Sequence, residues 1–95
     1  MDRLTTTIKR QWLAEIIAGS KKIEYREIKP YWRDRLAKVN VPFEMRLING
    51  MQQRAPEVTV LIHKVQKDIK NGVYKLQIRK VLTVKNWNSK REKPK

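Results

Sequence analysis

Three charged residues in the first third of the chain have the types and spacing of a small binding or catalytic site. Lys21, Glu24 and Arg26 follow Gly19 within one short segment. An arginine offers a planar fork of donors suited to phosphate or carboxylate, whereas a lysine supplies a mobile point charge. A glutamate beside the arginine would orient it or accept a hydrogen bond from a base edge. The alternative is an ion pair on a strand surface, which contributes little to stability.

A helix and a strand must position these residues. The helix is predicted by four apolar residues that share one face, namely Trp12, Leu13, Ile16 and Ile17. We expect Trp12 in the core and a left-handed cap at Gly19, because glycine adopts positive φ without a Cβ clash. The strand is predicted at Lys22–Ile28. Its alternation places Glu24 and Arg26 on one face, and Lys21 precedes it in the turn.

The remaining pattern is mostly that of strands. The other predicted elements are a strand at Leu4–Ile8, a short helix at Tyr31–Ala37, and strands at Phe43–Leu47, Val58–Val65 and Val73–Val84. The fourth strand, at Val58–Val65, is almost wholly apolar or β-branched, which predicts burial of both faces. Asn71-Gly72 predicts a hairpin, and broken alternation predicts a bulge near Arg79. We expect a mainly β (α+β), small antiparallel β-barrel at residues 1–86 and a basic, disordered tail at 87–95.

Charge narrows the class of partner. The 95 residues include 23 Lys or Arg and 9 Asp or Glu, a net charge of +14. Such a charge favours a polyanionic partner, most commonly nucleic acid. The chain has no cysteine, and its apolar runs are too short to cross a bilayer. We therefore expect a cytoplasmic protein with no membrane partner and no cofactor. His63, the only histidine, is expected to be partly buried rather than a metal ligand.

The segment with Gly19, Lys21, Glu24 and Arg26 resembles the Gly-x-Lys-x-x-Glu-x-Arg signature of the ASCH domain family, which belongs to the PUA-like β-barrels. The similarity covers roughly Leu4 to Ile28. It implies a barrel with a cleft beside the first helix, lined by these charged residues, and binding of RNA or other nucleic acid.

The resemblance also implies an enzymatic alternative. One branch of the family removes the acetyl group of N4-acetylcytidine with a lysine and a threonine in this motif. Lys21 matches the lysine, but Glu24 occupies the threonine position and cannot serve as a hydroxyl nucleophile. If the protein is an enzyme, Lys21 and Glu24 are its candidate catalytic residues, with Lys21 as the reactive base.

Further candidates for nucleic-acid binding lie outside the motif. Aromatic residues among cations are typical of single-strand binding, and Lys29, Tyr31 and Arg33 have this pattern. Tyr31 is the better candidate for stacking, whereas Trp32 is expected in the core. A basic track is predicted from Arg46, Lys75 and Arg79, although each of them is as readily explained as a solvated surface residue.

These observations favour a nucleic-acid-binding, most specifically RNA-binding, ASCH-like module. Two alternatives stay open. The first is a small hydrolase acting on RNA or a modified nucleoside, either a ribonuclease or an N4-acetylcytidine amidohydrolase. The second is a basic module that binds an acidic protein surface.

Overall fold

The computed structural model describes residues 1–88 and contains seven elements of secondary structure. In chain order these are β1 (Arg3–Thr7), α1 (Arg10–Ala18), β2 (Ile23–Glu27), α2 (Pro30–Ala37), β3 (Phe43–Ile48), β4 (Glu57–Asp68) and β5 (Val73–Lys85). The predicted elements are confirmed in type and order, with shifts of one to a few residues at their ends. The charged tail residues from 89 onward lie outside the described part of the chain.

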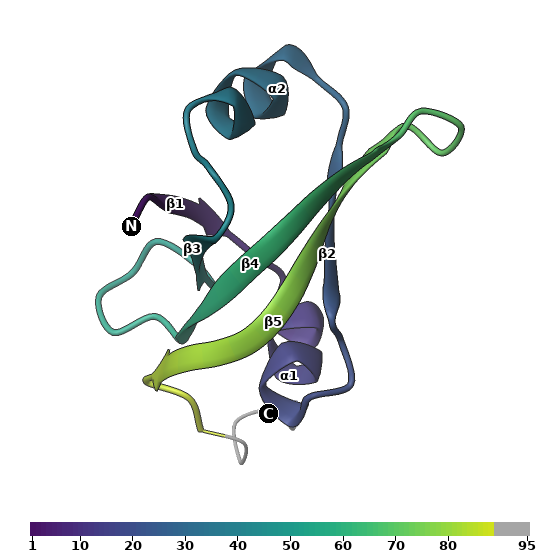
Figure 1. Ribbon diagram of the computed structural model, residues 1–95. Helices are drawn as coiled ribbons and strands as arrows, with labels where there is room; N and C mark the ends of the chain where they lie inside the picture. The colour runs from purple at the N-terminus through teal and green to yellow at the C-terminus, as the bar shows by residue number, and fades with distance from the viewer. Residues whose placement is uncertain (89–95) are drawn as a thin grey trace.

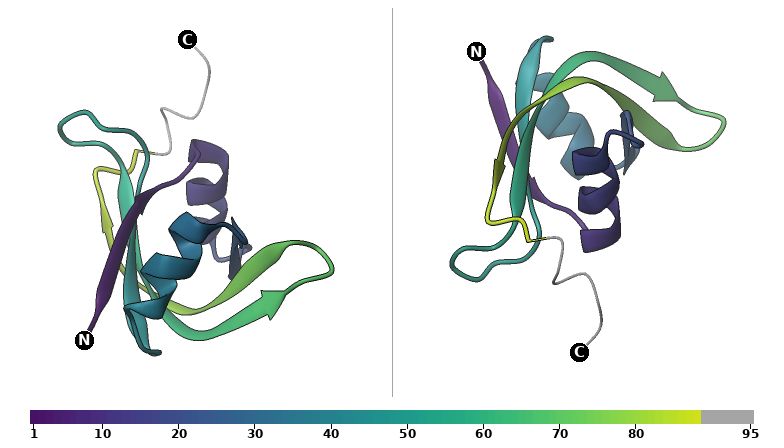
Figure 2. Two further views of the ribbon diagram at one scale, coloured as in Figure 1. Left: turned by 90° about the horizontal axis from the view of Figure 1, so that it is seen from above. Right: turned by 90° about the horizontal axis from the view of Figure 1, so that it is seen from below.

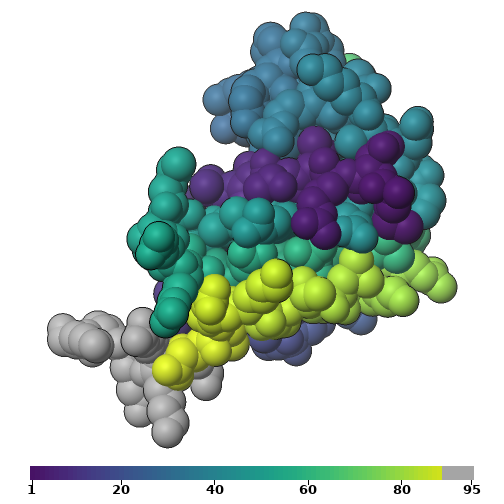
Figure 3. Space-filling model, turned by 90° about the vertical axis from the view of Figure 1, so that its left-hand side faces the viewer, coloured from purple at the N-terminus to yellow at the C-terminus, as the bar shows by residue number. Residues whose placement is uncertain are grey.

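The five strands form one curled sheet in the order β1-β3-β4-β5-β2 (Figure 1). β1 pairs with β3 in parallel, and the other three pairings are antiparallel. In the space-filling view, β1, the middle strands and the end of β5 cross the molecule as successive bands (Figure 3). The fold is therefore mainly β, with a sheet curled into a half-barrel and two short helices.

Both helices lie on the concave side of the sheet (Figure 2). Leu13 and Ile16 of α1 and Trp32 of α2 are buried against the inward-facing residues of the sheet. Those sheet residues are Leu4, Phe43, Met45, Leu47, Val58, Val60, Ile62, Tyr74 and Leu76. Gly19 ends α1 with φ of 84°, the left-handed cap that the sequence predicts.

The long β4–β5 pair is irregular at its bend. Leu61 pairs with Lys80 and Ile62 with Ile78, so Arg79 has no opposite residue on β4. The predicted bulge at Arg79 is thus confirmed, and His63 is bulged on the other strand in the same way. Bulges bend a ribbon and redirect side chains, which explains why this part of β4 and β5, with β2 paired to β5, diverges from β1 and β3 (Figure 1).

Two predictions about burial are wrong. The fourth strand is covered on both faces only in its first half, because His63 and Lys64 are exposed. The lone histidine is therefore a surface residue and not a partly buried one. The physical reason is the bulge, which leaves His63 without an opposite residue, while Lys64 projects from the convex face.

Candidate functional site

The charged motif forms one ion-paired cluster at the junction of α1 and β2. Glu24 is buried, with a relative exposure of only 5%. Its Oε1 lies 3.5 Å from the Nζ of Lys21, and its Oε2 lies 2.5 Å from the Nη2 of Arg26. The sequence allowed these residues to be an ion pair on an exposed strand surface. The structure excludes that alternative, because all three side chains are largely shielded from water.

Strand register explains why Glu24 points inward. Glu24 pairs with Leu76 of β5, and Arg26 pairs with Tyr74. Directly paired residues project from the same face of a sheet, and both partners belong to the core. The alternation in β2 therefore places a carboxylate and a guanidinium on the concave face of the sheet, where apolar residues are expected.

Arg26 also links the two edge strands of the half-barrel. Its Nη2 donates to the carbonyl oxygen of Thr7 on β1 at 3.0 Å, while its guanidinium carbon lies 5.1 Å from the centre of the Trp32 ring. Arg35 of α2 donates in the same manner to the carbonyl oxygen of Thr5 at 2.7 Å. These two arginines satisfy backbone acceptors on the outer edge of β1, so Arg26 has a structural role besides any role in binding.

One donor of this cluster has no partner among the described residues. The Nε of Arg26 is buried and makes no hydrogen bond there. A buried donor without an acceptor has a free-energy cost of about 1–3 kcal/mol.

Two exposed aromatic rings flank the lysine of the cluster. The Nζ of Lys21 lies 5.2 Å from the centre of the Trp12 ring and 5.1 Å from that of Tyr25. Trp12 is 39% exposed and Tyr25 is 50% exposed. The prediction that Trp12 belongs to the core is wrong. The buried residues Leu13 and Ile16 define the inner face of α1, and Trp12 lies at the margin of that apolar stripe.

The cluster opens into two adjoining hollows. The first, of about 490 Å³, is lined by Thr7, Ile8, Lys9, Trp12, Glu24, Tyr25, Arg26 and Asn49. The second, of about 460 Å³, is lined by Tyr25, Arg26, Glu27, Lys29, Tyr31 and Trp32. Both include Tyr25 and Arg26, so together they make one groove across the β2 edge. We call it the motif cleft.

The structure brings two more of the predicted residues to this cleft. Lys29 and Tyr31 line its second hollow, and Tyr31 is exposed. The Tyr31 ring packs edge-on against Trp32, and its hydroxyl accepts a hydrogen bond from Arg35. Trp32 itself is buried, as predicted. Arg33 is on the exposed side of α2 and pairs with Asp34 at 3.2 Å.

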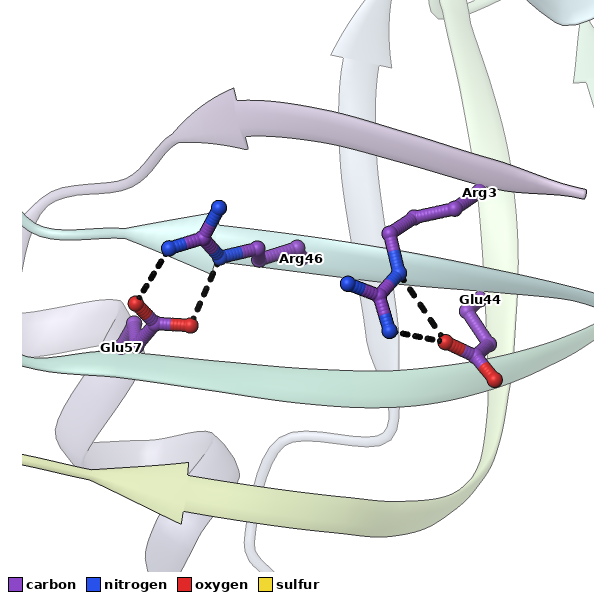
Figure 4. Close-up of polar contacts among 4 residues, drawn as sticks. All are labelled: Arg3, Glu44, Arg46 and Glu57. Atoms are coloured by element: carbon purple, nitrogen blue, oxygen red, sulfur yellow. Dashed lines mark hydrogen bonds and ion pairs between the residues drawn. The ribbon is translucent and has the colours of Figure 1, made fainter.

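The other predicted residues are elsewhere on the sheet. Arg46 projects from the convex face of β3 and makes a bidentate pair with Glu57, with two contacts of 2.7 Å (Figure 4). The hydrogen bond from Arg46 lowers the pKa of the Glu57 carboxyl. A third hollow adjoins this pair on the same face, but the guanidinium is already held by the carboxylate. Lys75 and Arg79 lie on β5 and do not line the motif cleft, although Lys75 is paired with Tyr25 at its margin.

Sequence reasoning missed Trp12 and Tyr25 as lining residues. Alternation places Tyr25 on the face opposite Glu24, so it gave no signal that both residues line one cleft, which they do because β2 is an edge strand. Trp12 had no signal either, since a tryptophan at the edge of an apolar stripe fits a core position equally well. Within residues 1–88, no cluster of three or more His, Cys, Asp or Glu side chains has an arrangement that could bind a metal. No helix in that range is long and apolar enough to span a membrane.

Comparison of the chain with protein-family models, with curated proteins and with solved structures finds no match.

Proposed function

We propose that the chain is an ASCH-like domain with a PUA-like barrel fold, and that it binds RNA through the motif cleft. The observation that carries this proposal is the pair of exposed rings, Trp12 and Tyr25, which line the cleft and both lie close to Lys21 beside it. Exposed rings beside a cation are suited to stack an unpaired base next to its phosphate. The net charge of +14 favours the same partner.

The floor of the cleft supplies polar groups for a base edge or a phosphate. Glu24 is fixed by Lys21 and Arg26, so its carboxylate is held in place before a ligand arrives. Preorganised groups lose less conformational entropy on binding.

Roles in this binding mode differ among the residues of the cleft and its surroundings. Trp12 and Tyr25 stack the base, Lys21 contacts the adjacent phosphate from a neighbouring hollow that both rings also line, and Lys29 and Tyr31 extend the contact along the second hollow. Arg33, Lys75 and Arg79 act at most as outer phosphate contacts. Arg46 contributes least, because Glu57 already occupies its fork of donors.

Fluorescence anisotropy with a labelled, unstructured RNA of about a dozen nucleotides tests the proposal. Loss of one stacked base costs roughly 1–3 kcal/mol, so Trp12→Ala should weaken binding by about 5- to 150-fold. Met51→Ala is the matched control, because Met51 is a highly exposed apolar residue outside the motif cleft. Binding that Trp12→Ala and Tyr25→Ala leave unchanged, or no binding by the native chain, would refute the proposal.

A hydrolase is the second candidate, and one contact favours it. The Nζ of Lys21 is 3.5 Å from the carboxylate of Glu24, which lines the cleft, so an amine and an acid lie side by side next to it. Incubation with N4-acetylcytidine and with RNA, followed by chromatography of the products, tests this candidate. Turnover that Lys21→Ala abolishes would support it. Intact substrates after incubation with the native protein would exclude these two reactions.

A further inference from the structure

The outer half of the β4–β5 pair is a second concentration of positive charge, separate from the motif cleft. We call residues 61–80 the basic ribbon. It contains six Lys or Arg residues and a single acid, Asp68. In Figures 1 and 2 the ribbon extends away from β1 and β3 and ends in the hairpin between β4 and β5. A projecting segment of this charge density repels itself unless a polyanion or counter-ions neutralise it.

Strand register gathers polar and cationic side chains on the convex face of the basic ribbon. Lys64 is opposite Gln77, and Gln66 is opposite Lys75. The two glutamines hydrogen-bond to each other at 2.8 Å. On the convex face two cations, Lys64 and Lys75, thus alternate with two amides, whereas the concave face of the same segment carries core residues such as Leu76.

The bulges add further cations at the base of the ribbon. Lys80 is opposite Leu61, on the convex side, and Arg79 is the bulged residue next to it. Lys64, Arg79 and Lys80 are all exposed. Lys75 is partly shielded and pairs with Asp68 at 3.3 Å. The bend thus presents cations where the ribbon leaves the body of the protein.

The chemistry of this face fits phosphates and not stacked bases. Tyr74 is the only Phe, Tyr or Trp residue of the basic ribbon, and it is buried. Single-strand binding depends on exposed rings, which this segment lacks. Double-helical RNA keeps its bases stacked and is recognised mainly through phosphates and 2′-hydroxyls. Cations interspersed with amide donors and acceptors match those groups.

We propose that the convex face of the basic ribbon binds the backbone of double-helical RNA. This inference rests on the proposed RNA-binding function and adds a second form of the same ligand. Tyr25 joins the two surfaces, because it lines the motif cleft and is also paired with Lys75 of the ribbon. An RNA with an unpaired nucleotide next to a stem would engage both.

Two triple variants of equal charge test the ribbon in the full chain. The ribbon variant is Lys64→Gln, Arg79→Gln and Lys80→Gln, and the control is Lys38→Gln, Arg54→Gln and Lys85→Gln. All six residues are exposed, and each variant loses three positive charges. The probes are a blunt 16-base-pair RNA duplex and an unstructured single strand, each titrated at several salt concentrations. Arg79→Glu alone serves as a second ribbon variant if the triple one unfolds.

The ribbon variant should lose at least about tenfold in duplex affinity, and the slope of log K against log salt should fall by roughly 2–3, near 0.9 per lost contact. The control should change duplex affinity less than about threefold, and single-strand affinity should be alike in both variants. Equal losses of duplex affinity in the two variants would overturn the proposal. So would ribbon-dependent binding to phosphatidylserine vesicles without duplex binding. Failure of the cleft proposal would look different. The native protein would then not bind the single strand, whereas the duplex affinities of the two variants could still be compared.

Discussion

Neutralising Glu24 should destabilise the protein strongly, although the change from Glu24 to Gln preserves shape. The carboxylate is the only acid in contact with both Lys21 and Arg26 in the described ion pairs, and its side chain is 6% exposed. At 3.5 Å the attraction to Lys21 alone is roughly 5 kcal/mol for an effective dielectric constant near 20, before desolvation is subtracted. Removing one partner of a buried pair typically costs about 3–5 kcal/mol, because the remaining charge stays buried without compensation.

Urea and thermal unfolding, followed by circular dichroism, measure this loss. A loss of 3 kcal/mol would lower the melting temperature by roughly 12–24 °C in a domain of this size. Glu44→Gln is the matched control, because Glu44 pairs with Arg3 at a site where the side chains are 26% and 53% exposed (Figure 4). An exposed pair contributes about 0–1 kcal/mol, so the control should unfold almost as the native protein does.

A second substitution separates uncompensated charge from general disruption. Lys21→Met in the Glu24→Gln background removes one of the two cations left without a counter-charge. It should recover part of the lost stability, so the two substitutions should be strongly non-additive. A loss below about 1 kcal/mol for Glu24→Gln, or simple additivity in the cycle, would refute the view that the cluster is a buried, mutually dependent unit.

Three further predictions concern acid stability, the helix cap and the cleft. The bond from Arg46 holds the Glu57 pKa below its ordinary value of 4.5. The resulting stabilisation is present above pH 4.5 and is lost as pH falls through the lowered pKa. Urea unfolding between pH 3 and 7 should therefore show a shallower acid loss in Glu57→Gln, and an unchanged profile would contradict this assignment. Gly19→Ala should cost about 1 kcal/mol by thermal unfolding, because φ of 84° strains an alanine although its Cβ would meet no atom within 4 Å. Trp12→Phe should remove most of the fluorescence quenching caused by RNA, whereas Trp32→Phe should retain it. The reverse result would place the base away from α1.

The sequence was sufficient for the elements and for much of the motif. Apolar spacing in α1, glycine at the left-handed cap and alternation in β2 are local properties, and they locate Lys21, Glu24 and Arg26 on one side of a strand. The bulge near Arg79 could also be predicted from the sequence, since Lys80 interrupts the alternation of apolar and polar residues along β5. These predictions hold because backbone sterics and side-chain periodicity act over only a few residues.

Burial and contact across the sheet were decided by tertiary structure. Pairing of β2 with the core side of β5 buries Glu24, and curling of the sheet brings Arg26 to the carbonyl oxygen of Thr7. Neither long-range pairing leaves a mark in the local pattern. Likewise, the exposure of Trp12 and His63 depends on where neighbouring elements end and not on their own residues. Sequence alone thus determined which charged residues share one segment and one strand face, whereas the fold determined which of them are shielded from water and which rings flank Lys21.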